Sequence, residues 1–243
     1  PGNKKKGGHF RPWGMRTAPP NAGQGVLVKG EMGAYAGFIG QMTTPGTYKV
    51  RLKADNYTDE GTLTLLPDPL QPELDYAKRR AASDDLFKMV EDLGFLVAQV
   101  QNLKDSTDQR LALVKDKKLK GKLTELSSNL EAFRKTLTET IESSGITGEQ
   151  QLRVRIGKLY AFAETSDDMV TKSVSDGAVV VKEELKQAHV KSETYFKKDL
   201  SLLNAGLKKE KLRPLSLIDQ AEWKKQHTGS APPKGGSFTL DLD

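Results

Sequence analysis

The stretch LFKMVEDLGFLVAQVQNL, residues 86–103, decides the fold of this chain. Its apolar residues recur every three or four positions, which places them on one face of an α-helix. That face consists of Leu86, Met89, Val90, Leu93, Leu96, Val97, Val100 and Leu103. The same spacing returns at 123–141, 152–163 and 181–207. Because the connections are short, residues 70–206 are predicted to form an antiparallel bundle of about four long helices.

Polar clusters mark the expected ends of these helices. The run DSTD at 105–108 is expected to separate the first helix from the second, and SSG at 143–145 to end the second. The run TGEQ at 147–150 is a capping box that opens the third helix. Residues 165–168 should separate the third helix from the fourth, with Thr171 as the N-cap of the last one.

Residues 1–69 have a different pattern, dense in Gly, Pro, Asn and Thr. The run YKVRLKA at 48–54 alternates apolar and polar residues, as a half-buried strand does. The run TLTL at 62–65 predicts the returning strand. Residues 55–56 and 59–61 are expected to provide the turn between them.

The remaining residues, 207–243, form a tail with a weaker pattern. In it, FTLDL at 238–242 alternates apolar and polar residues and is a candidate edge strand. The predicted fold class is therefore α+β. A short antiparallel β module at 1–69 is followed by a helical bundle at 70–206 and an extended tail.

The charge of the chain is unevenly spread. Its formal net charge is +6, and lysines are concentrated at 4–6, 117–122 and 208–213. Acidic residues are interleaved with basic ones elsewhere, so the runs favour solvated helix surfaces over a nucleic-acid interface. Polyanion binding through the lysine runs is a third hypothesis. No apolar run approaches the roughly 20 residues that a transmembrane helix needs.

The sequence contains no recognisable catalytic or metal-binding pattern. Cysteine is absent, which excludes disulfides and thiol catalysis. His9, His189 and His227 are far apart and lack the spacing of metal ligands. No nucleophile elbow or phosphate-binding loop occurs either. We therefore expect no catalytic residue, no metal site and no cofactor in this segment.

Four residues are candidates for interaction or packing: Trp13, Arg16, Tyr48 and Trp223. Trp13 is expected to be the core tryptophan of a small β module, or to stack with Arg16 and bind a ligand. Trp223 precedes two lysines, which is compatible with a surface cation–π pair or an interface anchor.

Three motifs of the N-terminal part occur in a characteristic order: GHFRPWGMR at 8–16, PGTYKVRL at 45–52 and LPDP at 66–69. Together they resemble the Ig/fibronectin-like module that follows the β-propeller in bacterial sortilin-type proteins, which are often labelled BNR-repeat or glycosyl-hydrolase-like. Residues 150–160 and 199–207 resemble the helical tail of such proteins.

The chain departs from that family in three ways. Gly14 stands where the family usually has Asp, and Leu70 where it has Arg. The β region is also shorter than the roughly 100 residues of a complete sandwich. The resemblance thus implies an incomplete Ig-like module, whose first strands and propeller would lie upstream of Pro1.

The resemblance also implies a location and a role. It predicts a secreted, periplasmic or surface protein of a Gram-negative bacterium of the Bacteroidota. The expected function is a non-catalytic interaction or scaffold part of a larger exported β-propeller protein. Its expected partner is the propeller or another protein chain, in an outer-membrane-associated complex, with no nucleic acid and no transmembrane segment. The alternative is an accessory part of a secreted glycan- or peptide-processing enzyme complex, with the active site on another segment or chain.

Overall fold

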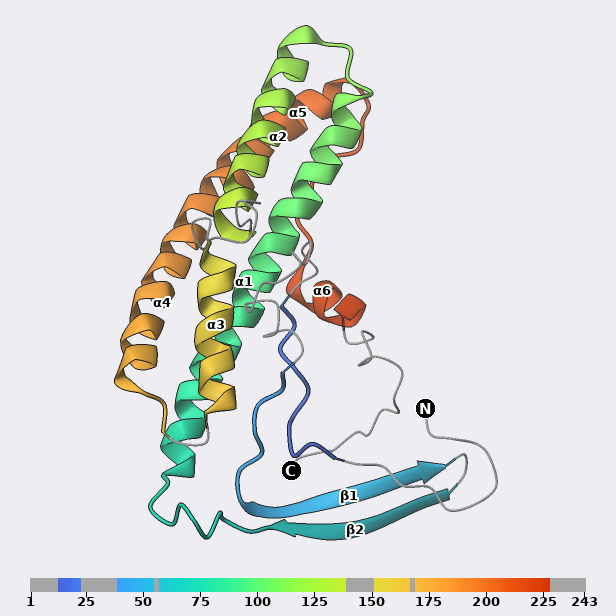
Figure 1. Ribbon diagram of the computed structural model, residues 1–243. Coiled ribbons are helices and arrows are strands. Elements are labelled where there is room, and N and C mark those ends of the chain that lie inside the picture. Colours follow the sequence, from blue (N-terminus) through green and yellow to red (C-terminus); the bar gives the residue numbers. More distant parts are fainter. Residues whose placement is uncertain (1–12, 23–38, 55–56, 139–150, 167–168, 228–243) are drawn as a thin grey trace, which may run out of the picture.

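The computed structural model describes residues 13–22, 39–54, 57–138, 151–166 and 169–227 (Figure 1). Within these ranges the chain is mostly helical and has one small antiparallel sheet, so the predicted α+β class is confirmed.

The helices pack side by side into an elongated bundle. In the described ranges they are α1 (Tyr76–Leu111), α2 (Lys117–Thr138), α3 (Leu152–Thr165), α4 (Lys172–Glu193), α5 (Leu200–Lys209) and α6 (Gln220–His227). The π-helical segment η2 (Thr194–Asp199) joins α4 to α5. The helix α1 runs the length of the bundle, and both α2 and α3 pack along it (Figure 1). The described residues of the four predicted stripes lie in α1, in α2, in α3, and in α4 with η2 and α5; Ile141 of the second stripe lies outside the described residues.

Some of the predicted helix ends are confirmed and one is wrong. The expected break at 105–108 is wrong, because α1 continues to Leu111. Thr107 is buried inside that helix, and its hydroxyl donates to the Leu103 carbonyl at 2.8 Å. The end of α3 at Thr165 and the N-cap at Thr171 are confirmed. The expected helix end at 143–145 and capping box at 147–150 lie outside the described residues.

Two strands, β1 (Gly46–Ala54) and β2 (Tyr57–Leu65), form an antiparallel hairpin. Its register pairs Tyr48 with Leu63 and Arg51 with Glu60. The expected turn at 59–61 is wrong, since these residues lie inside β2; residues 55–56 are outside the described part. The hairpin projects sideways from one end of the bundle, which we call the foot (Figure 1).

The hydrophobic core lies between the helical columns and consists of the predicted apolar stripes. Part of the tail belongs to it, because Leu215 and Trp223 are buried. The predicted boundary at 206 falls within α5. The candidate edge strand at 238–242 lies outside the described residues.

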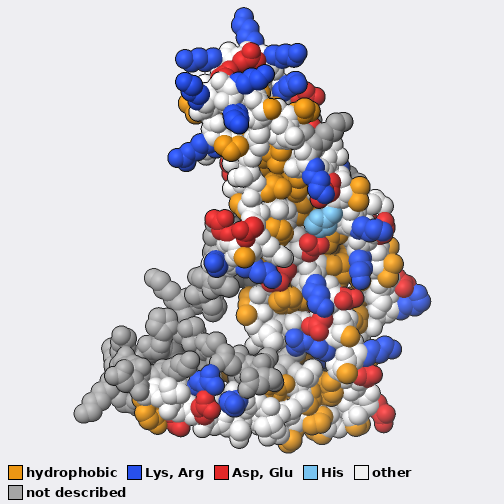
Figure 2. Space-filling view, turned by 180° about the vertical axis from the view of Figure 1, so that it is seen from behind, with side chains coloured by type: hydrophobic (Ala, Val, Ile, Leu, Met, Phe, Trp, Pro, Cys, Tyr) orange, Lys and Arg blue, Asp and Glu red, His pale blue; other side chains and the backbone are white. Residues whose placement is uncertain are grey.

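The surface is unevenly charged. Lysine and arginine gather at the end of the bundle opposite the hairpin (Figure 2). Each helix that the structure describes is too short or too polar to cross a lipid bilayer.

Candidate functional site

The strongest concentration of buried polar groups lies where the N-terminal segment meets the foot of the bundle. We call it the junction; its residues are Arg16, Gln41, Met42, Arg80, Ser83, Asp84 and Glu164. At its centre Glu164, in the last turn of α3, is only 2% exposed. One carboxylate oxygen accepts a hydrogen bond from the Ser83 hydroxyl. The other accepts from the Met42 amide at 2.7 Å and from Arg16 at 3.1 Å.

Arg16 connects two segments of the N-terminal region to α3. Its guanidinium donates to the Gly40 carbonyl at 2.9 Å and to the Glu164 backbone carbonyl at 2.8 Å, besides its ion pair. Backbone hydrogen bonds also join residues 15–17 to 41–43. Gly40 permits this close approach, since a Cβ there would lie 1.7 Å from the Thr17 carbonyl oxygen.

A second layer of the junction surrounds Gln41 and Asp84. The side-chain amide of Gln41 donates to the Asp84 carboxylate at 2.7 Å and to the Ser83 hydroxyl at 2.9 Å. Arg80 donates to the Asp84 carboxylate and to the side-chain oxygen Oε1 of Gln41, both at 2.9 Å. Partial burial raises the pKa of Asp84, but the hydrogen bonds from Gln41 and Arg80 outweigh it, and the net pKa is lowered.

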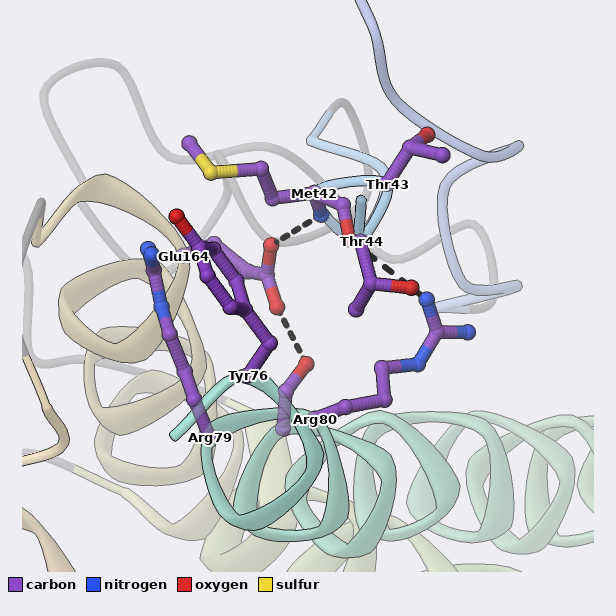
Figure 3. Close-up of a pocket in the computed structure, with 8 residues that line it drawn as sticks. Met42, Thr43, Thr44, Tyr76, Arg79, Arg80 and Glu164 are labelled. Carbon is purple, nitrogen blue, oxygen red and sulfur yellow. Dashed lines mark hydrogen bonds between the residues drawn. The ribbon is translucent and has the colours of Figure 1, made fainter. Parts of the chain in front are cut away.

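A small hollow adjoins Glu164 and is drawn in Figure 3. It is lined by Met42, Thr43, Thr44, Tyr76, Arg79, Arg80, Ser83 and Glu164. The hollow has room for about one water molecule, not for a metabolite. The guanidinium of Arg79 donates to the Ser166 carbonyl. Because Ser83 and Glu164 are buried and hydrogen-bonded to the chain itself, the centre of the junction fastens segments together.

The structure brings three of the four predicted residues together. Trp13 and Tyr48 pack edge to face, with ring centroids 6.0 Å apart. The Trp13 indole donates to the Arg16 carbonyl at 3.3 Å. Trp13 therefore serves as a packing residue, and Arg16 is directed to the junction instead of to an external ligand.

Trp223 lies elsewhere, in α6. It is almost completely buried and packs on Phe95 of α1, with ring centroids 5.4 Å apart. It fastens the tail to the bundle rather than projecting from a surface helix.

A histidine–carboxylate pair outside the junction joins α4 to α1. His189 of α4 and Asp92 of α1 are 2.9 Å apart. The hydrogen bond to Asp92 raises the pKa of His189, and partial burial opposes it. Among the described residues, no three His, Asp or Glu side chains are placed to hold a metal ion.

The sequence does hint at the buried polar residues that were not predicted. Glu164 follows Tyr160 by four positions and Ser83 precedes Leu86 by three, so both extend a buried helix face.

Comparison with known proteins adds no further constraint: no family model, curated protein or solved structure matches the chain.

Proposed function

We propose that this chain is a non-catalytic interaction module that docks through the hairpin β1–β2. The observation that carries the proposal is the apolar face of that hairpin, on which Leu52, Tyr57 and Leu63 are exposed among the described residues. The junction supports it too, because its central carboxylate, Glu164, is buried and is engaged in holding the chain together.

The two faces of the hairpin differ in chemistry. Paired residues share a face, so Arg51 and Glu60 lie together on the polar side, with an ion pair at 2.6 Å. The opposite side is mostly apolar. It includes Tyr48, Val50, Leu52, Tyr57, Leu63 and Leu65, together with Gly61 and one exposed charged residue, Asp59, which pairs with Leu52. Trp13 packs on Tyr48 near the bundle. Opposite Tyr48, Leu63 is 42% exposed, and farther out Leu52 and Tyr57 are 53% and 59% exposed.

Such a hairpin is incomplete as a folding unit. Two strands alone are only marginally stable in water. Exposed apolar residues that lie next to one another typically mark an interaction surface. Among the described residues, each strand pairs along one edge only. The free edges and the apolar face suit a partner that contributes β-structure.

The kind of partner we propose follows from the resemblance to the sortilin-type module. In our proposal, strands from a β-propeller protein or another chain complete an Ig-like sandwich over the hairpin. The helical bundle then acts as a spacer in an exported, envelope-associated assembly.

Site-specific photo-crosslinking in the producing cells tests the docking face. A photoreactive residue replaces Leu63 on the apolar face or, as the matched control, Thr62 on the polar face. Both positions are exposed and adjacent in β2. We expect position 63 to give one dominant crosslink to a strand-forming segment of another protein, and position 62 to give little. Equal crosslinking from both positions, or none from position 63, would contradict the proposal.

A further inference from the structure

Two lysine-rich segments that are far apart in sequence meet at the end of the bundle opposite the hairpin (Figure 1). The backbone amides of Lys115 and Asp116 donate to the Glu210 carboxylate at 2.9 and 2.7 Å. Arg110 donates to the Arg213 carbonyl at 3.1 Å. We call the combined surface, residues 110–122 and 206–213, the basic tip.

The net charge of the basic tip exceeds the net charge of the whole chain. Segment 110–122 carries six basic residues and one acidic residue, and segment 206–213 carries four and one. The tip is therefore +8 and the rest of the sequence −2, against +6 in total. Both acidic residues are engaged with backbone amides: Asp116 accepts from Leu119 at 2.7 Å, and Glu210 accepts from the turn.

The lysines of the tip point into solvent. Those at positions 115, 117, 118, 120, 122, 208, 209 and 211 are exposed, and none forms an ion pair with a described residue. Figure 2 shows basic side chains spread around this end of the molecule. Among them stands Leu113, in the turn between α1 and α2, which is 59% exposed.

We propose that the basic tip binds an anionic lipid surface, with Leu113 entering the headgroup region. Polybasic surfaces are attracted to anionic leaflets, and the burial of one apolar side chain in the headgroup region strengthens that binding. Lysine, a compact hydrated charge, outnumbers arginine eight to two here, which suits diffuse attraction more than bidentate recognition. The tip segments contain no aromatic residue for base stacking, and their charges surround the end of a rod, which favours a lipid surface over nucleic acid.

The position of the tip agrees with a role distinct from that of the hairpin. The helix α1 has 36 residues, which corresponds to roughly 54 Å. The hairpin and the basic tip lie at opposite ends of this length (Figure 1). A protein partner at one end and a lipid surface at the other can therefore be engaged at the same time.

Vesicle sedimentation with the full chain tests the proposal. The probes are vesicles of phosphatidylcholine alone and of phosphatidylcholine with about 30% phosphatidylglycerol, at about 0.1 M salt. The tip variant is K117Q/K118Q/K208Q/K209Q. The matched control, K78Q/K172Q/K182Q/K186Q, removes the same charge from other exposed positions. Circular dichroism verifies that both variants keep the helical content of the wild type.

We expect the wild type and the control to bind only the anionic vesicles. Each lysine near such a surface is worth roughly a fivefold change in partitioning, so the tip variant should bind at least about 100-fold more weakly. Leu113→Ala should weaken binding to vesicles but not to a DNA duplex. Absence of binding to anionic vesicles, equal loss in the control variant, or tighter binding to DNA that ignores Leu113 would each overturn the proposal.

Discussion

Replacement of Glu164 with alanine perturbs the junction at its centre. The carboxylate is 2% exposed and accepts from Ser83, Met42 and Arg16. Its removal leaves the Met42 amide and the Ser83 hydroxyl without their acceptor, and each buried donor left unsatisfied costs about 1–3 kcal/mol. Arg16 loses an ion pair but keeps two carbonyl acceptors.

The expected loss can be bounded from these contacts. Breaking a buried pair costs about 3–5 kcal/mol, but the Arg16 side chain is 30% exposed, so solvent replaces part of the lost interaction. We therefore expect Glu164→Ala to lower the free energy of unfolding by about 3 kcal/mol. Glu164→Gln keeps the shape and one acceptor oxygen, and should cost about 1 kcal/mol.

Urea unfolding followed by circular dichroism measures both values. The control is Glu183→Ala, which removes an exposed carboxylate that pairs with Lys186 at 3.6 Å on the surface of α4. That change should stay within about 0.5 kcal/mol of the wild type. A loss below about 1 kcal/mol for Glu164→Ala would refute the view that the junction holds the N-terminal segment to the bundle.

Three further predictions concern the bundle. Leu130→Ala in the core should cost about 3 kcal/mol in urea unfolding, while Leu202→Ala, at an exposed position, should be near neutral. Ser106→Pro should cost about 3 kcal/mol or more and reduce ellipticity at 222 nm, since α1 is continuous there; a loop would tolerate it. Because the pKa of His189 is raised in the fold, its contribution to stability is full below its ordinary value and is lost as pH rises through the raised value. Asp92→Asn should remove this part of the pH dependence, and an unchanged pH profile would contradict the assignment.

The helical part of the fold was predictable because apolar periodicity reports directly on buried faces. The false break at 105–108 shows where that reasoning fails. A run of four polar residues is typical of a loop, yet Thr107 remains in the helix by donating to a carbonyl one turn earlier. Composition alone does not distinguish this arrangement from a turn.

The candidate site was less predictable, because its contacts are distant in sequence. Arg16 and Glu164 are separated by 148 residues, and nothing local to either indicates the other. In the sequence the lysine segments 117–122 and 208–213 are separate, and each alone predicts a solvated helix face. Only the packing of α5 against α2 places them together, where Gly206 lies directly against Leu119.

Hydrogen–deuterium exchange of the isolated chain tests most directly the claim that the hairpin awaits a partner. We predict that the amides of β1 and β2 exchange far faster than those at the centre of α1, because an isolated pair of strands with exposed apolar residues opens readily. Protection of β1 and β2 equal to that of α1 in the isolated chain would contradict the proposed docking role.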